Sequence, residues 1–265
     1  MKLFHRKYGS GPPLVILHGL YGSSDNWVSV AGKLSDTFTV ILPDLRNHGQ
    51  SPHSQTHNYE EMANDIAELI KDCGYDRIFL AGHSMGGKVA IKFASAWPEK
   101  LNGLIILDIS PFGTGNTDNP FYKEHRTILE AISGVEPADF KKREEIDIYL
   151  SGSISSEKTR SFIMKNIKRD ADGKLGWKLN IPALLANLDE ITGGVIERGN
   201  PGIRITGFPV IFVKGEQSGY LTETDRPGIE YHFPAAEFIT IPGAGHWIHS
   251  DNPALTESAI RSILN

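Results

Sequence analysis

The sequence predicts an α/β fold in which a mostly parallel, doubly wound sheet carries an inserted helical cap. Strand and helix signals alternate from residue 13 to residue 107, which is typical of a parallel sheet covered by helices on both faces. The alternation then stops, and residues 111–206 carry helical signals without a strong strand. Strand signals return after residue 207, so we expect the insertion to separate two parts of one sheet.

The elements of the sheet part are predicted from short apolar runs and from apolar residues at helical spacing. The predicted strands cover residues 13–17, 38–42, 77–81, 101–107, 209–213 and 237–241. The predicted helices cover residues 26–34, 59–71, 88–96 and 252–264. The strand from 101 to 107 is strongly apolar, as expected for a strand buried on both faces.

The insertion is predicted to be helical throughout. Its expected helices cover residues 122–132, 137–150, 157–168 and 183–191, and the glycine-rich stretch 192–201 is predicted to be a linker. We therefore predict a core of residues 1–111 and 207–265, with a helical cap of residues 112–206 inserted between its two parts.

A Gly-x-Ser-x-Gly motif, Gly82 to Gly86, stands between the strand ending at Ala81 and the helix 88–96. A nucleophile elbow requires this order of strand, motif and helix, because flanking glycines allow a turn tight enough to expose a strained serine. Ser84 is therefore the candidate nucleophile. Taken alone, the motif is also compatible with a simple glycine-rich connection.

A serine nucleophile needs an imidazole to take and return its proton, and N–H donors for the oxyanion. His246 follows the last predicted strand and comes after Ser84 in the chain, as expected for this architecture. The amide of Met85, directly after the nucleophile, is one predicted oxyanion donor. The second is the amide of Leu20, in the loop after the first predicted strand, which we prefer to that of Tyr21.

The carboxylate that would orient His246 has two candidates. The loop after the strand that follows the cap contains Glu216, and it has Ser218 about where a carboxylate is expected. Asp108 ends the apolar strand 101–107, where a buried aspartate would be costly without hydrogen bonds. We favour Asp108 over Glu216, with Ser218 as an additional hydrogen-bond partner of the His246–Asp108 pair.

Three other polar residues are interpreted as structural. Asp44 and Arg46 lie in a glycine-ended loop after the second predicted strand, where such side chains usually tie their own turn together. Lys88, in the first turn of the elbow helix, is interpreted as a hydrogen-bond donor rather than a catalytic base.

Composition excludes several classes of protein. The formal net charge of −5 over 265 residues argues against a nucleic-acid partner, which would require clustered Lys and Arg. The apolar runs are too short for a membrane span, and residues 1–6 lack the apolar segment of a secretory signal, so a cytoplasmic location is expected. The single cysteine, Cys73, excludes an internal disulfide and a thiolate-rich metal site.

Taken together, these motifs resemble the α/β-hydrolase superfamily, and within it the YbfF-type small serine esterases. The segments that carry the resemblance are Gly-His-Ser-Met-Gly-Gly-Lys at 82–88, Leu-Asp-Ile-Ser-Pro at 107–111, Asp-Leu-Arg-Asn-His-Gly at 44–49 and Trp-Lys-Leu-Asn-Ile-Pro at 177–182. The resemblance implies an acid after the sixth strand and a serine after the seventh, which match Asp108 and Ser218. The chemistry it implies needs no metal ion and no organic cofactor.

We therefore expect a serine carboxylesterase that hydrolyses small or short-to-medium acyl esters, its small-molecule substrates, through an acyl-enzyme on Ser84. A serine there argues against dehalogenase and epoxide hydrolase chemistry, in which the nucleophile is an aspartate. An acyl-CoA thioesterase would use the same groups, and the run 141–143 offers it only a weak basic cluster. A ligand-sensing receptor with slow turnover is the alternative from another class. The sequence does not indicate an oligomeric state.

Overall fold

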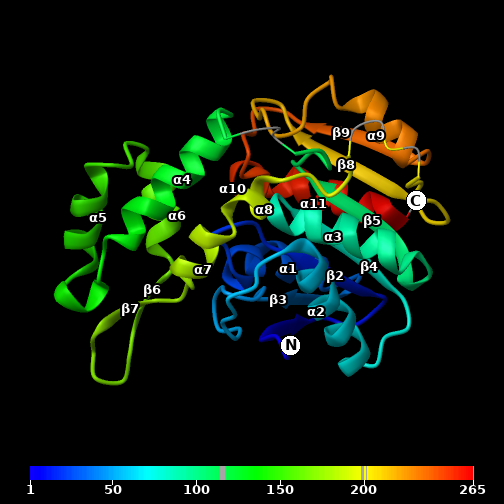
Figure 1. The fold of residues 1–265 in the computed structure, drawn as a ribbon. Helices are drawn as coiled ribbons and strands as arrows, with labels where there is room; N and C mark the ends of the chain where they lie inside the picture. The colour runs from blue at the N-terminus through cyan, green and yellow to red at the C-terminus, as the bar shows by residue number, and fades with distance from the viewer. Residues whose placement is uncertain (114–116, 198–199, 201, 265) are drawn as a thin grey trace.

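A central sheet of seven strands organises the part of the chain described by the computed structural model, residues 1–113, 117–197, 200 and 202–264 (Figure 1). The strands are β1 (His5–Tyr8), β2 (Pro13–Leu17), β3 (Thr39–Pro43), β4 (Ile78–His83), β5 (Leu101–Leu107), β8 (Val210–Gly215) and β9 (Ala236–Ile241). Their spatial order is β1-β3-β2-β4-β5-β8-β9. Only the β1–β3 pair is antiparallel, so the predicted mostly parallel α/β sheet is confirmed.

The register of the central strands brings their carboxyl ends to one edge of the sheet. Leu17 of β2 pairs with Gly82 of β4, and the end of β4 pairs with Leu107 of β5. Leu107 in turn pairs with Val213 of β8. Loops that follow neighbouring parallel strands meet at such an edge, so the segments after these strands lie close together.

Helices cover both faces of the sheet, as predicted. They are α1 (Val28–Leu34), α2 (Tyr59–Asp72), α3 (Met85–Ala96), α9 (Arg226–His232), α10 (Ile248–Asp251) and α11 (Pro253–Arg261), with short 3-10 turns η1 (Ser24–Trp27), η2 (Pro98–Lys100) and η4 (Ser262–Leu264). Met62 and Ile66 of α2 and Val89 of α3 belong to one buried cluster. Val30 of α1 and Ile260 of α11 belong to a second cluster, so each face of the sheet has its own apolar layer.

The segment between β5 and β8 is mainly helical, and in Figure 1 much of it extends to one side of the sheet. It contains α4 (Pro120–Ser133), η3 (Pro137–Asp139), α5 (Arg143–Ser151), α6 (Glu157–Met164), β6 (Ile167–Arg169), β7 (Leu175–Trp177), α7 (Ile181–Ala186) and α8 (Leu188–Thr192). The division into a core and a separate cap domain of residues 112–206 stays a prediction.

Three expectations for this segment were wrong. The helix predicted over 137–150 is the turn η3 followed by the separate helix α5, with residues 140–142 between them. The helix predicted over 157–168 ends at Met164, and a β6–β7 hairpin occupies a region where no strand was expected. The turn of this hairpin explains the difference, because the Asp170 carboxylate accepts hydrogen bonds from the amides of Asp172 and Lys174. Gly173 follows with φ of 81°, a left-handed conformation that suits glycine and ends any helix.

Three smaller elements also differ from expectation. The edge strand β1 and the helix α9 were not predicted, and the expected helix 252–264 is α11 followed by the turn η4. Part of the expected linker 192–201, namely 198–199 and 201, lies outside the described residues.

The insertion is fastened to the loops of the sheet by polar contacts. The Asn180 amide groups donate to the backbone oxygen and the Oδ1 atom of Asn47, at 3.0 and 2.9 Å. Asn166 Nδ2 donates to the Tyr21 carbonyl at 2.8 Å. These contacts place the insertion directly over the loops that follow β2 and β3.

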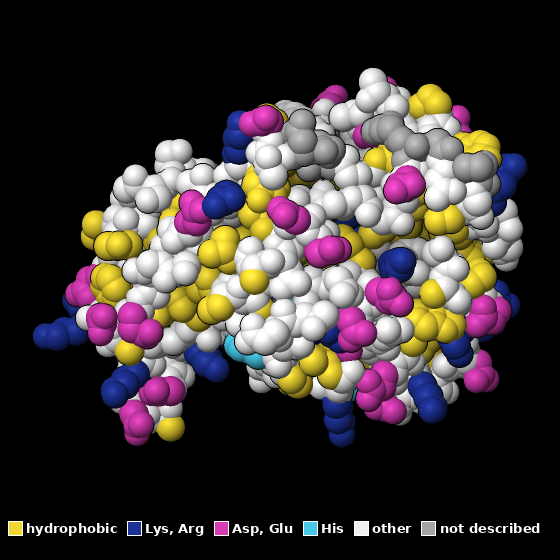
Figure 2. Space-filling view, in the orientation of Figure 1, with side chains coloured by type: hydrophobic (Ala, Val, Ile, Leu, Met, Phe, Trp, Pro, Cys, Tyr) yellow, Lys and Arg dark blue, Asp and Glu magenta, His cyan; other side chains and the backbone are white. Residues whose placement is uncertain are grey.

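The surface is mixed in charge. On the face shown in Figure 2, basic and acidic side chains are interspersed, with hydrophobic side chains between them. Within the described ranges, we find no helix that combines the length and the apolar character needed to cross a bilayer.

We predict that removing the buried carboxylate of Asp65 strongly destabilises the fold. Arg46 Nε and Nη2 donate to the two Asp65 oxygens at 2.6 and 2.9 Å, and both side chains are buried. Without Asp65, the buried Arg46 is left with the half-exposed Glu61 carboxylate at 3.2 Å, so Asp65→Ala should lower the free energy of unfolding by about 3–5 kcal/mol. Urea denaturation measures this loss. As a control, Glu130→Ala, which breaks an exposed pair with Arg126, should cost less than about 1 kcal/mol. Equal losses in the two variants would contradict the prediction.

Candidate active site

Ser84 lies at a sharp turn between β4 and α3. Its backbone has φ of 54° and ψ of −121°, a strained conformation for a residue with a side chain. The turn is closed by glycines at two close approaches: a Cβ on Gly82 would lie 2.2 Å from the Gly86 carbonyl, and one on Gly86 would lie 2.6 Å from the carbonyls of Leu17 and His18. The predicted strand, turn and helix are therefore present, and the geometry is that of a nucleophile elbow.

The structure brings Ser84, His246 and Asp108 together in one hydrogen-bonded chain. His246 Nε2 lies 3.0 Å from Ser84 Oγ, and His246 Nδ1 lies 2.8 Å from Asp108 Oδ2. A carboxylate can only accept, so Nδ1 carries the proton and Nε2 is free to accept the Ser84 hydroxyl. The order hydroxyl, imidazole and carboxylate is the arrangement required to activate a serine.

Asp108 is fully buried, and every oxygen of its carboxylate has a donor. Gly215 N donates to Oδ1 at 2.8 Å, and the Ser218 hydroxyl donates to Oδ2, the oxygen that also faces His246. The structure thus places Ser218 against the Asp108 carboxylate. These bonds offset the cost of burying a charged group.

Glu216, the alternative acid, lies elsewhere. Its side chain is exposed, and its Oε2 accepts from Gly243 N at 2.8 Å. No hydrogen bond between Glu216 and His246 occurs in the described part of the chain.

Leu20 and Met85 border the same cavity as Ser84. Met85 is the first residue of α3, where a helix leaves its N–H groups without intrahelical partners. Within the described ranges, neither amide donates a hydrogen bond. The loop of Leu20 is fixed by His18, whose Nδ1 donates to Gly19 O at 2.8 Å while its Nε2 accepts from Leu45 N at 2.9 Å. Burial lowers the pKa of His18, which keeps the imidazole neutral for this double role.

His83, inside the elbow motif, holds the backbone of His246. Its Nε2 donates to the His246 carbonyl at 2.7 Å. Burial, together with the neighbouring imidazoles of His246 and His249, holds the pKa of His83 well below its usual range. A neutral His83 therefore fixes the position of the loop that carries His246.

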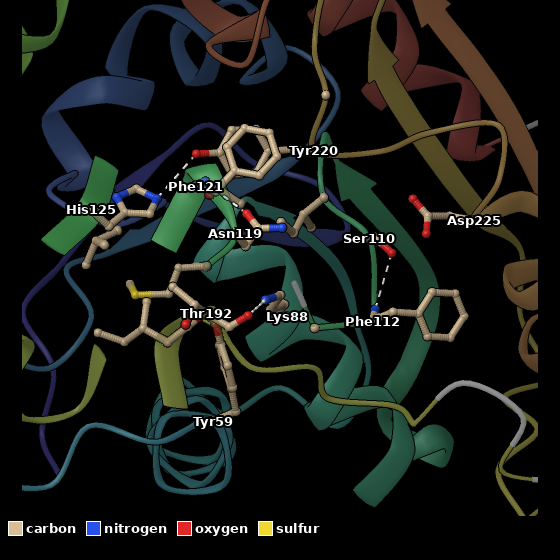
Figure 3. Close-up of a pocket in the computed structure, with 17 residues that line it drawn as sticks. Tyr59, Lys88, Ser110, Phe112, Asn119, Phe121, His125, Thr192, Tyr220 and Asp225 are labelled. Atoms are coloured by element: carbon tan, nitrogen blue, oxygen red, sulfur yellow. Dashed lines mark hydrogen bonds between the residues drawn. The ribbon is translucent and has the colours of Figure 1, made fainter. Parts of the chain in front are cut away.

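Two cavities meet at Ser84. The first, which we call the Lys88 cavity, has a volume of about 250 Å³ and is bordered by Met85, Lys88, Tyr59 and Phe112 (Figure 3). The second, which we call the Trp247 cavity, has a volume of about 300 Å³ and is bordered by His246, Trp247, Phe162 and Tyr21. Ser84 and Leu20 border both cavities, so a substrate attacked by Ser84 can extend into each of them.

Tyr220 and His125 lie at the junction of the two cavities and were not predicted from the sequence. The Tyr220 ring stacks on the His246 imidazole with centroids 3.7 Å apart, and its hydroxyl lies 3.3 Å from His125 Nε2. Burial, with smaller contributions from the neighbouring His246 and Lys88 side chains, lowers the pKa of His125 to about 4. The only sequence signal for Tyr220 is its position two residues after Ser218.

The residues interpreted as structural make structural contacts. The Asp44 carboxylate accepts from the amides of Ser24 and Gln50 at 2.6 and 2.8 Å, and Arg46 pairs with Asp65. Lys88 donates to the carbonyls of Thr192 and Gly193. Among the described residues, no group of three His, Cys, Asp or Glu side chains is placed to hold a metal ion.

Known proteins share this architecture. Residues 12–126 match the family described as alpha/beta hydrolase fold. The chain is 34% identical to the sn-1-specific diacylglycerol lipase ABHD11 of Danio rerio over 97% of this chain and 79% of that protein. The chain belongs to the α/β-hydrolase family.

Two further relatives of this α/β-hydrolase are esterases. The chain is 31% identical to Esterase YbfF of Escherichia coli strain K12, over 96% of this chain and 93% of that protein. A solved structure described as a marine microorganism esterase is 43% identical and superimposes with a TM-score of 0.93, covering 99% of both chains. The resemblance to YbfF-type esterases is therefore confirmed, and the relatives place the chain among the esterases and lipases of the family.

The close packing of the elbow predicts that Gly86→Ala is destabilising. The added Cβ would meet the carbonyls of Leu17 and His18 at 2.6 Å, and backbone must move to relieve the contact. Overpacking of this kind costs about 1–3 kcal/mol, measurable by urea denaturation. The matched control is Gly32→Ala in α1, where a Cβ meets nothing within 4 Å and should stabilise the helix by about 0.5–1 kcal/mol. Equal effects in both variants would contradict the packing explanation.

Proposed function

We propose that this protein is a serine carboxylesterase that hydrolyses short acyl esters through an acyl-enzyme on Ser84. The observation that carries the proposal is the hydrogen-bonded chain from Ser84 through His246 to the buried Asp108, next to two unpaired amides. Acyl transfer needs these groups together: a nucleophile, a base, an orienting carboxylate and donors for the oxyanion.

The first half of the reaction forms the acyl-enzyme. Ser84 Oγ attacks the ester carbonyl carbon while its proton passes to His246 Nε2, which lies 3.0 Å away. The carbonyl oxygen becomes an oxyanion and accepts hydrogen bonds from the amides of Leu20 and Met85. Protonated His246 then gives its proton to the departing alkoxide, so the alcohol leaves neutral and Ser84 carries the acyl group.

The second half repeats these steps with water. Water gives a proton to His246 Nε2 as its oxygen attacks the acyl carbonyl, and the proton returns to Ser84 Oγ when the acid is released. Asp108 stays ionised, accepting from Gly215 N and the Ser218 hydroxyl, and stabilises the imidazolium in both halves. No metal ion or organic cofactor is required for any step.

The position of His246 assigns the two cavities. A leaving group must lie beside the imidazole that protonates it, and His246 borders the Trp247 cavity. The alcohol portion therefore occupies the Trp247 cavity, and the acyl portion extends into the Lys88 cavity, which is bordered by both Leu20 and Met85. An apolar cavity of about 150 Å³ holds one benzene molecule, so the roughly 250 Å³ of the Lys88 cavity suits a short acyl chain.

Three substitutions test the assignment of the acid and the nucleophile. Ser84→Ala should abolish hydrolysis of p-nitrophenyl butyrate, and Asp108→Asn should lower kcat by about 10³ to 10⁴, because the wrong imidazole tautomer is then favoured. Glu216→Gln should change kcat less than about threefold, because Glu216 bonds to Gly243 N and not to His246. Loss of activity in Glu216→Gln with little loss in Asp108→Asn would reverse the assignment.

The size of the Lys88 cavity predicts a preference for short acyl groups. In a p-nitrophenyl series from acetate to palmitate, kcat/KM should be highest at six carbons or fewer and at least tenfold lower for palmitate. The same acyl groups offered as CoA thioesters distinguish an esterase from a thioesterase, since the chemistry is shared. Faster turnover of the thioesters would contradict the ester assignment, and no turnover of either would contradict the hydrolase mechanism on Ser84.

A further inference from the structure

We propose that Lys88 binds a free carboxylate on the acyl portion of the substrate, so that the preferred substrates are hemiesters of short dicarboxylic acids. This inference rests on the proposed serine esterase function and names a substrate class for it. It depends on where Lys88 lies, on what its ammonium contacts, and on the cavity that Lys88 shares with Ser84.

Lys88 is a buried cation next to the candidate nucleophile. Its side chain is 3% exposed, and it borders the cavity that receives the acyl portion in the proposed mechanism. Lys88 lies in the first turn of α3, Ser84 is the N-cap residue of that helix, and both residues border this cavity. Figure 3 shows Lys88 among the residues that line the cavity, near Thr192.

The contacts of the Lys88 ammonium leave its charge without a counter-ion. Nζ donates to Gly193 O at 2.6 Å and to Thr192 O at 3.3 Å, and it lies 5.8 Å from the centre of the Tyr59 ring. Within the described ranges, no carboxylate lies within ion-pair distance of it. An ammonium has three N–H donors, so two bonds to carbonyls leave one donor for a ligand.

A buried ammonium without a counter-ion is costly. The hydrogen bonds that join Lys88 to Thr192 and Gly193, at the end of α8, do not require a charged group. A neutral amide side chain could bond the same two carbonyls, whereas an isolated buried charge is normally paired. Burial lowers the pKa of Lys88 to about 8, so most of the protein still carries the charge at pH 7. A substrate carboxylate would supply the missing negative charge and accept the remaining donor.

The shared cavity fits a short dicarboxylic acyl group. Ser84 and Lys88 both border the Lys88 cavity, whose volume of about 250 Å³ suits an acyl chain of four or five carbons. A succinyl or glutaryl group attached at Ser84 could therefore reach Lys88 with its free carboxylate. The acidic residue bordering the same cavity, Asp225, is already hydrogen-bonded, since its Oδ2 accepts from Thr222 N and Oγ1 at 3.0 and 2.8 Å.

The test compares a hemiester with a neutral ester of the same chain length. Monobenzyl glutarate and benzyl pentanoate share the alcohol and the number of acyl carbons, and release of benzyl alcohol is measured by chromatography. For the unmodified protein, kcat/KM should be at least tenfold higher for the hemiester. The ratio of the two kcat/KM values should fall at least tenfold in Lys88→Met, which removes both the charge and the tether.

Lys88→Gln separates the effect of the Lys88 charge from the effect of its hydrogen bonds, and Lys165→Met is the control. Lys88→Gln keeps an N–H donor for the carbonyls of Thr192 and Gly193 but has no charge, and its ratio should fall as far as that of Lys88→Met. Lys165→Met removes an exposed lysine that does not border the Lys88 cavity, and its ratio should equal that of the unmodified protein. If the Lys88 variants lower both activities equally and leave the ratio unchanged, Lys88 is only a tether and the proposal is wrong.

Inhibition of the unmodified protein gives a second measurement that needs no folded variant. Glutarate should inhibit hydrolysis of p-nitrophenyl butyrate with a Ki at least tenfold below that of pentanoate, and equal values would overturn the proposal. Failure of the esterase function itself has a different signature. In that case Ser84→Ala would retain hydrolysis of benzyl pentanoate, whereas a failed carboxylate site leaves this hydrolysis dependent on Ser84.

Discussion

The buried carboxylate of Asp108 is the interaction around which the site is arranged. It directly follows β5, the strand between β4 and β8, and it accepts hydrogen bonds from the end of β8, from the loop after β8 and from His246. Asp108 has φ of 52°, a left-handed conformation that turns its side chain out of the regular strand path. Three donors are thus held by one side chain, and losing it would leave Gly215 N, the Ser218 hydroxyl and His246 Nδ1 each without this partner.

The strain at Ser84 depends on the same sheet. A serine with φ of 54° persists only where the surroundings fix it, and here Ser84 N donates to Leu107 O at 3.0 Å. The carbonyls that approach Gly86 belong to the end of β2, which also leads into the loop of Leu20. The register of β2, β4 and β5 therefore sets the relative positions of the nucleophile and both candidate oxyanion donors at once.

The parts of this protein that could be predicted from sequence are those determined by local pattern. The strand over 101–107 was predicted at its observed bounds, because a continuous apolar run between turn signals has few other interpretations. The β6–β7 hairpin was missed because its strands are three residues long and its Ile167 fits a helical spacing as well. Only the Asp170 turn with Gly173 distinguishes the hairpin from a continued helix.

Contacts between distant segments could not be predicted in the same way. Tyr220 and His125 are 95 residues apart, and no spacing in the sequence relates them to each other or to His246. The choice of Asp108 over Glu216 rested on burial at a strand end, which the sequence could indicate. Which carboxylate faces His246 depends on how the loop after β8 turns, and that is decided by tertiary contacts such as the bond from Glu216 to Gly243 N.

Tyr220 and His125 also connect the insertion to the chemistry. His125 lies on α4 and Tyr220 lies in the loop after β8, so the contact between them joins the helical segment to the ring that stacks on His246. Ser84 is only 9% exposed, and a substrate must therefore enter through cavities whose walls include α4. Any shift of α4 that widens these cavities would also move the support of the Tyr220 ring. In the proposed mechanism, access to Ser84 and the orientation of its base are consequently linked through one aromatic contact.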